Sequence, residues 1–340
     1  MKKNNPVVAL STLFLLIILA GCNIDSALST ENDGNKKKKE QQENKMDSNE
    51  NNPTMKVTLL GTGTPDPQIN RFGGSTLVEV AGKKLLFDAG RGSGIRLNQI
   101  GIPPGEINKL FITHLHHDHT VGFPDLLISG SVPSMGGRQD PFEVWGPKGT
   151  KNMVEGLYKA YKTDIENRQN VTNATESGLD TNVHEFEEGV VYDKNGVEII
   201  AFEVDHGSME PAYGFRVNYK GRSVVISGDT TYSENLVKYA KGTDLLIHEV
   251  LAASSKPNKK IENESIRNIK SYHSTPEQAA KVFKQVNPKL AVYTHVISIG
   301  VSDSEGNYIE RTKEIYDGKV VLGEDLMTFE IAEGITVSQP

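Results

Sequence analysis

The chain has 340 residues, of which 36% are hydrophobic, and its formal net charge is −7. An acidic chain argues against tight binding of structured RNA, because that binding depends mainly on Lys and Arg side chains that neutralise phosphates. The single cysteine, Cys22, excludes an intramolecular disulfide, so the fold must depend on its hydrophobic core and on any metal that it holds.

The first 22 residues have the pattern of a secretory signal. Two lysines precede an apolar stretch, residues 7–20, which is shorter than the roughly 20 residues that span a bilayer comfortably. The stretch leads into Leu-Ala-Gly-Cys at residues 19–22, which resembles the bacterial lipobox, where the cysteine is lipidated and becomes the new first residue. We therefore expect a lipoprotein signal peptide over residues 1–21 and lipidation of Cys22. The alternative is an ordinary cleaved signal with an incidental cysteine.

Residues 22–54 are poor in large apolar side chains and rich in Asn, Glu, Lys, Ser and Asp. Such a segment cannot bury enough apolar surface to offset the entropy that it would lose on ordering. We expect a disordered polar tether of about 30 residues, with a typical span of roughly 30 Å. Loss of residues 1–21 would remove two lysines and change the net charge to −9.

From residue 55 the pattern changes to short β-rich runs with helical stretches between them, and no repeat of fixed period is present. The expected strands are Lys56–Leu60, Thr76–Val80, Lys84–Phe87, Leu110–Thr113, Phe142–Trp145, Val197–Val204, Gly214–Tyr219, Ser223–Ser227, Asp244–Glu249 and Leu290–His295. The expected helices are Ile95–Gln99, Lys148–Lys162, Ser233–Lys241 and Pro276–Val286. Strands that alternate with helices predict an α/β domain over residues 55–340, with two sheets and helices outside them.

The most informative motif directly follows the expected strand Leu110–Thr113. Residues 114–119 read His-Leu-His-His-Asp-His. Imidazoles and carboxylates are ligands that a Zn²⁺-like ion prefers, and a loop that leaves a strand can turn them toward one point. The spacing His-x-His-x-Asp-His supplies ligands for two ions rather than one; these candidate ligands are His114, His116, Asp118 and His119.

Three more candidate ligands lie at the ends of expected strands. His206 follows Val197–Val204, Asp229 follows a strand and the tight turn at Gly228, and His295 ends the last expected strand. Strand ends that meet at one edge of a sheet can share a site. Together with the His-rich motif, these residues predict a site for two divalent ions. Histidine and carboxylate ligands suit Zn²⁺ but also Mn²⁺ and Fe²⁺.

From about residue 56 to residue 331 the chain resembles the metallo-β-lactamase superfamily, in the branch that contains ribonuclease Z and related phosphodiesterases and arylsulfatases. The resemblance depends on the His-rich motif, on His206, on Ser-Gly-Asp-Thr at 227–230 and on Thr-His at 294–295. It implies a four-layer αββα sandwich. It also implies two ligand groups joined by a bridging aspartate: His114, His116 and His206 for one ion, Asp118, His119 and His295 for the other, and Asp229 between them.

Two further segments resemble those of ribonuclease Z relatives. Ile-His-Glu at 247–249 matches their His-Glu pair, and His-Ser-Thr at 273–275 matches the segment that opens a helix. One of the two residues after His273 is expected to cap that helix, so that His273 is free to face the site. We expect His273 to protonate the leaving oxygen as general acid, with Glu249 orienting it. The alternative for Glu249 is a buried carboxylate with a structural role, and the alternative for His273 is a residue that only precedes the helix.

Three other residues complete the predicted site. Asp118 is expected to orient the attacking water as well as to bind the second ion. Asp88, after the strand Lys84–Phe87, is expected to accept hydrogen bonds that fix the His-rich motif. Arg216 is expected to contact an anionic group of the substrate, and a surface salt bridge explains this residue equally well.

These residues predict a dinuclear zinc hydrolase. Two divalent ions would share a bridging water and lower its pKa, and the resulting hydroxide would attack phosphorus. The first hypothesis is a phosphodiesterase of the ribonuclease Z type that acts on a small anionic ester outside the cell, anchored to the bacterial membrane through lipidated Cys22. The alternatives are an arylsulfatase or lactonase of the same superfamily, and a surface binding protein without activity. The sequence is also compatible with a homodimer.

Structured RNA is not an expected partner. Ribonuclease Z proper carries a Lys-rich arm with Gly and Pro that grips tRNA. The polar stretch Asp164–Glu188, expected as an exposed excursion near the rim of the site, has no such character. The residues after His295, Val-Ile-Ser-Ile, also differ from the Ser-Arg-Tyr type of continuation in ribonuclease Z. Both differences argue against tRNA processing.

Overall fold

The computed structural model describes residues 54–340, except 172–173, 254–263 and 302–305. The predicted signal peptide, Cys22 and all but the last residue of the predicted tether lie outside the described residues. Among the helices of the described part, none combines the length and the apolar character that crossing a membrane requires.

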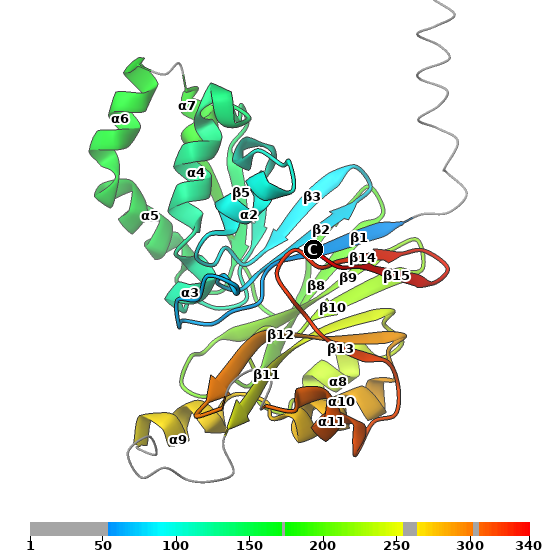
Figure 1. Cartoon of the computed structure of the whole chain (residues 1–340). Coiled ribbons are helices and arrows are strands. Elements are labelled where there is room, and N and C mark those ends of the chain that lie inside the picture. Colours follow the sequence, from blue (N-terminus) through cyan, green and yellow to red (C-terminus); the bar gives the residue numbers. More distant parts are fainter. Residues whose placement is uncertain (1–53, 172–173, 254–263, 302–305) are drawn as a thin grey trace, which may run out of the picture. The chain divides into compact units, whose positions relative to one another are not determined.

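Two sheets form the centre of the domain (Figure 1). The first has eight strands in the order β15-β14-β1-β2-β3-β4-β5-β6, and the second has seven in the order β13-β12-β11-β10-β9-β8-β7. The strands of the first sheet are β1 (Met55–Gly61), β2 (Ser75–Val80), β3 (Lys83–Phe87), β4 (Lys109–Phe111), β5 (Phe142–Gly146), β6 (Thr181–Glu185), β14 (Thr328–Ile331) and β15 (Ile335–Ser338). Those of the second are β7 (Gly189–Lys194), β8 (Val197–Val204), β9 (Ala212–Tyr219), β10 (Arg222–Ile226), β11 (Leu245–Ala253), β12 (Leu290–Ile299) and β13 (Val320–Leu322).

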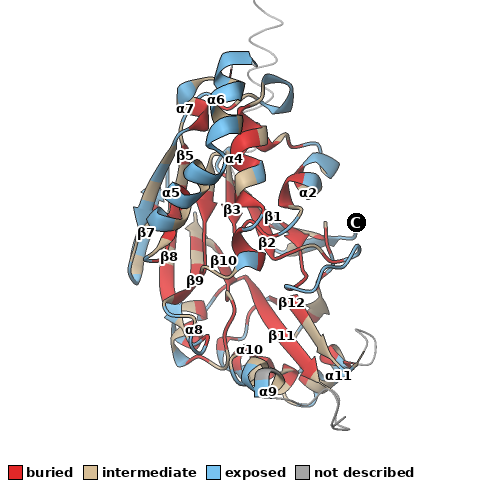
Figure 2. Cartoon of the chain, turned by 90° about the vertical axis from the view of Figure 1, so that its left-hand side faces the viewer, coloured by how far each residue is buried: buried red, intermediate tan, exposed pale blue. Residues whose placement is uncertain are grey.

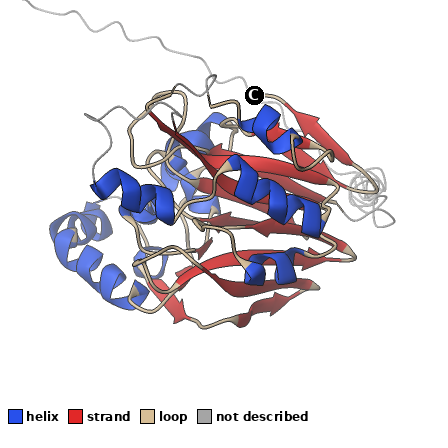
Figure 3. Ribbon diagram, turned by 90° about the horizontal axis from the view of Figure 1, so that it is seen from below, coloured by secondary structure: helices blue, strands red, loops and turns tan. Residues whose placement is uncertain are grey.

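Helices lie outside both sheets, and Figure 3 shows them across the outer face of the second. The helices that follow strands of the first sheet are α2 (Ser93–Gln99), α3 (His117–Thr120), α4 (Phe123–Ser131), α5 (Thr150–Ala160), α6 (Lys162–Val171) and α7 (Glu176–Leu179), with 3₁₀ turns at Pro104–Glu106 and Pro133–Met135. Those that follow strands of the second are α8 (Glu234–Ala240), α9 (Glu264–Ser271), α10 (Pro276–Val286) and α11 (Tyr308–Lys313). Most of the strands are buried, whereas α5 and α6 are largely exposed (Figure 2).

Three hydrophobic clusters divide the domain into four layers. Val78 of β2 and Val224 of β10 belong to the cluster between the two sheets. Their neighbours point the other way: Leu77 joins the cluster that contains residues of α2 and α4, and Val225 joins the cluster that contains residues of α8 and α10. Because successive strand residues face opposite sides of a sheet, each sheet is covered on both faces. The structure therefore confirms the predicted α/β fold with a four-layer αββα sandwich.

The polar stretch 164–188 is more regular than the sequence predicted. It contains most of α6, all of α7 and β6, and β6 pairs in parallel with β5 at the edge of the first sheet. No residue of α6, which the structure describes in full, is buried. A helix that is polar all round has no apolar period, so the sequence pattern gave no signal for it.

The strand that carries His295 also differs from the prediction, because β12 continues past His295 to Ile299. In the parallel pairing with β11, Glu249 lies opposite Thr294 and Val250 lies opposite Val296, so His295 is an extra residue in the ladder. Its φ of 44° is rare for a residue other than glycine. A β-bulge of this kind re-aims one side chain without ending the strand.

His248 makes the stability of the fold sensitive to acid. It lies fully buried within β11, where its Nδ1 donates to the carbonyl oxygen of Glu249 at 2.7 Å and its Nε2 has no partner among the described residues. Burial lowers the pKa of His248 to about 4, so the ring is neutral in the folded protein. Since the unfolded pKa is about 6.5, the unfolded chain takes up the proton first as the pH falls.

We expect this difference to remove about 2 kcal/mol of the free energy of unfolding between about pH 7 and pH 5. The stabilisation is present above the unfolded pKa and is lost as the pH falls toward the folded pKa. Urea unfolding at both pH values should show a smaller loss for His248→Asn than for the wild type. The matched variant His184→Asn, which changes an exposed histidine of β6, should keep the wild-type loss. An unchanged pH dependence in His248→Asn would contradict the assignment.

Candidate metal centre

The seven predicted ligands meet where four strands end or bend. The His-rich motif follows β4 and enters α3, His206 follows β8, Asp229 follows β10, and His295 is the bulge residue of β12. All of them except His116 are buried. At Gly228, with φ of 62°, an added Cβ would lie 2.4 Å from the carbonyl oxygen of Tyr213. Glycine is therefore required in the turn that presents Asp229.

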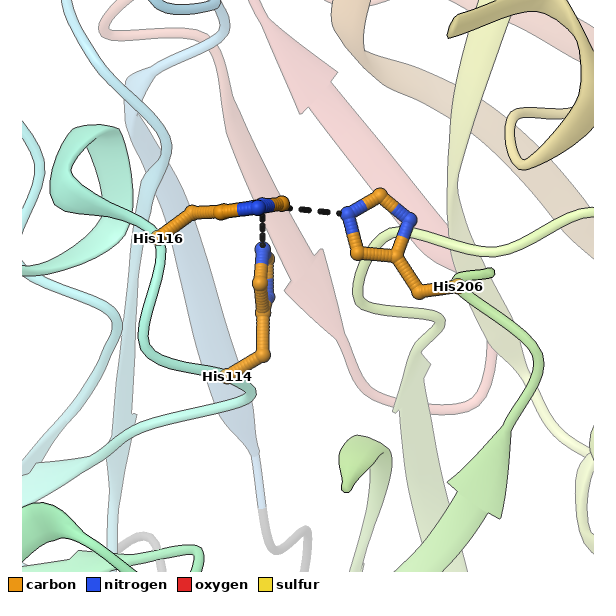
Figure 4. Close-up of side chains that lie close together, drawn as sticks. All are labelled: His114, His116 and His206. Carbon is orange, nitrogen blue, oxygen red and sulfur yellow. Dashed lines mark hydrogen bonds between the residues drawn. The ribbon is translucent and has the colours of Figure 1, made fainter. Parts of the chain in front are cut away.

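Three imidazole rings form the first ligand group (Figure 4). The Nδ1 atom of His116 lies 3.0 Å from Nε2 of His114 and 3.2 Å from Nε2 of His206. Nitrogen atoms that hold one Zn²⁺ at about 2.0–2.1 Å in a tetrahedral arrangement lie about 3.3 Å from one another. The three nitrogens therefore have the spacing of ligands to a single ion.

Asp118, His119 and His295 form the second group. The Oδ2 atom of Asp118 lies 3.2 Å from Nε2 of His295 and 3.5 Å from Nε2 of His119. The bulge in β12 brings His295 to this position, where it contacts Asp118, a residue 177 positions away along the chain.

Asp229 joins the two groups through one oxygen atom. Its Oδ2 lies 3.3 Å from Nε2 of His119 and of His295, on the side of the second group. The same atom lies 3.8 Å from Nε2 of His114 and of His206, on the side of the first group. One carboxylate oxygen is thus within reach of both groups, which is the arrangement of a bridging ligand.

Hydrogen bonds behind the rings fix which nitrogen faces the centre. Nδ1 of His119 donates to Oδ2 of Asp88 at 2.8 Å, and Nδ1 of His206 donates to the carbonyl oxygen of Tyr272 at 3.1 Å. The hydroxyl of Thr113 gives its proton to Asp88 at 2.8 Å, so it accepts from Nδ1 of His114 at 3.0 Å. In each case Nε2 is the ring nitrogen that faces the centre.

The electrostatics of the site fit a bound cation. Burial alone would lower the pKa of His119, but Asp229, Asp88 and Asp118 raise it well above its usual value. Burial would raise the pKa of Asp229, but His295 and His119 hold it well below its usual range. The carboxylate of Asp229 therefore stays ionised and attracts positive charge, while Nε2 of His119 is buried with no hydrogen-bond partner among the described residues. A divalent ion would supply both the charge and the missing partner.

Asp88 lies behind the His-rich motif, in the position that the sequence predicted. Its Oδ1 accepts from the backbone N–H of Thr113 at 2.8 Å, in addition to the two bonds made by Oδ2. We expect Asp88→Ala to weaken metal binding by about 10–100-fold, because the ring of His119 loses the partner that orients it. Chelator competition would measure the change. Asp193→Ala, an exposed aspartate of β7, is the matched control, and equal affinity in the two variants would contradict this role for Asp88.

His273 and Glu249 lie together beside the ligand groups. Nδ1 of His273 donates to Oε1 of Glu249 at 2.9 Å, and the same oxygen accepts from the backbone N–H groups of Thr230 and Ser274 at 3.0 and 3.2 Å. Thr275 is the N-cap of α10 and forms a capping box, which leaves His273 just outside the helix. Burial and the charge of Asp229 raise the pKa of Glu249 well above its usual value, whereas burial lowers the pKa of His273.

Arg216 does not line the cavity beside the ligand groups, so the structure contradicts its predicted contact with substrate. Its guanidinium, on β9, donates to Oδ1 of Asn218 at 2.8 Å and to the carbonyl oxygens of Tyr239 and Lys241 at 2.8 and 3.0 Å. Tyr239 and Lys241 are at the end of α8, whose last carbonyls need donors. Arg216 therefore ties the C-terminus of α8 to the second sheet.

A cavity of about 380 Å³ opens beside the two ligand groups. Five predicted site residues line it: His116, Asp118, Asp229, His273 and His295. The other lining residues are Thr64, Pro65, Asp66, His117, Ile266, Ile269, Tyr272, Ile297 and Ile299. His117 lies within the His-rich motif, but the ligand spacing His-x-His-x-Asp-His does not include it, so the sequence did not predict it as a site residue. The described residues of the stretch 164–188 do not line this cavity, contrary to the expected position near its rim.

Known proteins share this fold and are similar to this sequence. The model of the family described as "Beta-lactamase superfamily domain" matches residues 83–296. The chain is 32% identical to ribonuclease Z of Mycobacterium marinum over 277 residues, which cover 82% of this chain and 99% of that protein.

Solved structures agree with this relationship. Human tRNase Z, short form, superposes with a TM-score of 0.59 at 28% identity, over 80% of this chain and 98% of the human one. The metallo-β-lactamase fold protein YhfI from Bacillus subtilis superposes with a TM-score of 0.63 at 20% identity, over 82% of this chain and all of that one, and shows the same fold. The chain therefore belongs to the β-lactamase superfamily and, within it, to the ribonuclease Z family, and it is a hydrolase.

Proposed function

We propose that the protein is a phosphodiesterase of the ribonuclease Z type that uses two divalent ions, Zn²⁺ first among them, to hydrolyse a small anionic ester. The observation that carries the proposal is the position of Oδ2 of Asp229 between two complete ligand groups. His114, His116 and His206 would hold one ion, and Asp118, His119 and His295 the other.

Two bound divalent ions supply positive charge at the scissile group and lower the pKa of a water molecule in the site. The residues of the chain then have separate tasks. Asp118, a buried carboxylate held ionised by His119 and His295, accepts a hydrogen bond from that water and orients it. His273 lines the cavity and donates a proton to the leaving oxygen, and Glu249 holds its ring in place through Nδ1.

The proposed substrate is smaller than a tRNA, even though the relatives include proteins named ribonuclease Z. The net charge of −7 supports this choice, because a structured RNA needs many cationic contacts along its phosphates. We further propose that the protein acts outside the cell, held at the bacterial membrane by lipidated Cys22; the pattern of residues 1–22 supports this. The homodimer stays a prediction.

Hydrolysis assays with the metal-loaded protein would test the function. Bis(p-nitrophenyl) phosphate should be cleaved faster than p-nitrophenyl sulfate and an acyl lactone, and chelation should stop the reaction. Faster cleavage of the sulfate or the lactone would favour the alternative activities. Efficient removal of the 3′ trailer from a precursor tRNA would overturn the small-substrate proposal. No turnover of any of these compounds would favour a binding protein.

A further inference from the structure

One wall of the cavity beside the metal centre is apolar. It consists of four half-buried isoleucines from two elements, which we call the isoleucine wall: Ile266 and Ile269 of α9, and Ile297 and Ile299 of β12. Pro65 and the ring of Tyr272 border it.

The local structure explains why these side chains share one face. Residues three apart on a helix lie on one side of it, as Ile266 and Ile269 do, and residues two apart on a strand point the same way, as Ile297 and Ile299 do. Ser298, between the two strand residues, points away and its hydroxyl lies 2.7 Å from the hydroxyl of Tyr308 in α11. The bulge at His295 turns a ligand into the site just two positions before this pair begins.

The charges around the cavity limit what can enter. Neither Lys nor Arg occurs among the lining residues, all of which lie in the described part of the chain. Asp66, Asp118 and Asp229 contribute carboxylates instead. Among the described residues that line the cavity, a ligand with several phosphates would find cationic partners only at the metal centre, so this lining favours one anionic group. The part of the ligand that lies against the isoleucine wall faces side chains that cannot form hydrogen bonds with it.

We propose that the isoleucine wall binds an alkyl or aryl group of the substrate, so that the enzyme prefers a monoanionic ester with an apolar substituent over a nucleotide or an oligonucleotide. This inference rests on the proposed function, because it assigns the substrate class of the same centre. Covering the half-buried isoleucines with an apolar group removes hydrocarbon surface from water on both partners. Each methylene that becomes buried should strengthen binding by a factor of up to about four.

Calorimetric titration of the metal-loaded protein with methylphosphonate, butylphosphonate and phenylphosphonate tests the wall without requiring turnover. We expect butylphosphonate and phenylphosphonate to bind at least about tenfold more tightly than methylphosphonate. The double variant Ile297→Thr/Ile299→Thr keeps β-branched residues in the strand but removes the apolar surface, and should reduce this ratio to below about threefold. The matched control is Ile335→Thr, which changes a half-buried strand isoleucine outside the cavity and should keep the wild-type ratio.

Equal binding of the three phosphonates by the wild type would overturn the inference. So would a wild-type ratio in the double variant together with a lower melting temperature, because the isoleucines would then only hold α9 in place. Ile269→Ser, on the surface of α9, repeats the test if the strand variant does not fold. Turnover of bis(p-nitrophenyl) phosphate by the same preparations separates the two proposals: its absence would refute the proposed function, whereas the phosphonate ratio alone decides the role of the wall.

Discussion

Asp229→Ala is expected to abolish hydrolysis, with the largest loss of any single substitution in the site. The variant removes the one oxygen that lies within 3.8 Å of four histidine Nε2 atoms. Without it the two ligand groups are no longer joined, and like-charged ions would face each other without an anion between them. Loss of several kcal/mol of charge stabilisation lowers kcat/KM by about 10³-fold or more.

Elemental analysis of the purified variant, beside assays on bis(p-nitrophenyl) phosphate, would check this expectation. The wild type should retain about two divalent ions per chain and Asp229→Ala fewer. Asp193→Ala provides an exposed aspartate as control, and should retain both metal and activity. Full activity in Asp229→Ala, or full activity of a metal-free wild type, would refute the dinuclear centre.

His273→Ala is expected to give the second-largest effect, and one that depends on the leaving group. A general acid contributes about 10²–10⁴-fold, so kcat should fall by that order for an ester with a poorly leaving alkoxide. The fall should be much smaller for p-nitrophenolate, which leaves without help from a proton. Glu249→Gln, which keeps the shape of the side chain, should cause a smaller loss because His273 is still present but less well oriented.

The leaving-group dependence distinguishes an acid from a metal ligand. His273 also lies within 4.8 Å of possible ligand atoms of His206 and Asp229, so a role as a ligand is testable at the same time. Retained metal together with a loss confined to poor leaving groups would support the acid. A lower metal content in His273→Ala, with equal losses for both kinds of ester, would show that His273 is a ligand instead. His184→Ala, in an exposed position on β6, is the matched control.

The candidate ligand residues were predictable because their chemistry is local, whereas their division into two groups was implied by the family resemblance. A histidine or aspartate directly after a β-rich run is visible in the sequence, and parallel strands bring such ends to one edge of a sheet. His206 and Asp229 were found in this way, as was the place of Asp88 behind the His-rich motif. The β-rich runs of β2 and β10 likewise predicted strands, and the structure shows that their alternate residues fill different cores.

Features that depend on contacts between distant segments were not predictable. The bulge at His295 arises from its pairing with β11, and the place of Arg216 is determined by the carbonyl groups at the end of α8. Helix α9 was not predicted at all, and the isoleucine wall exists only because α9 and β12 line the same cavity.

By itself, the sequence determined which types of side chain the candidate centre contains, because each candidate ligand belongs to a short segment that can be recognised on its own. Only the tertiary structure decided which side chains line the cavity around that centre. The physical reason is that the direction of a side chain depends on strand register and on packing between layers, and both are settled by residues far apart in the chain.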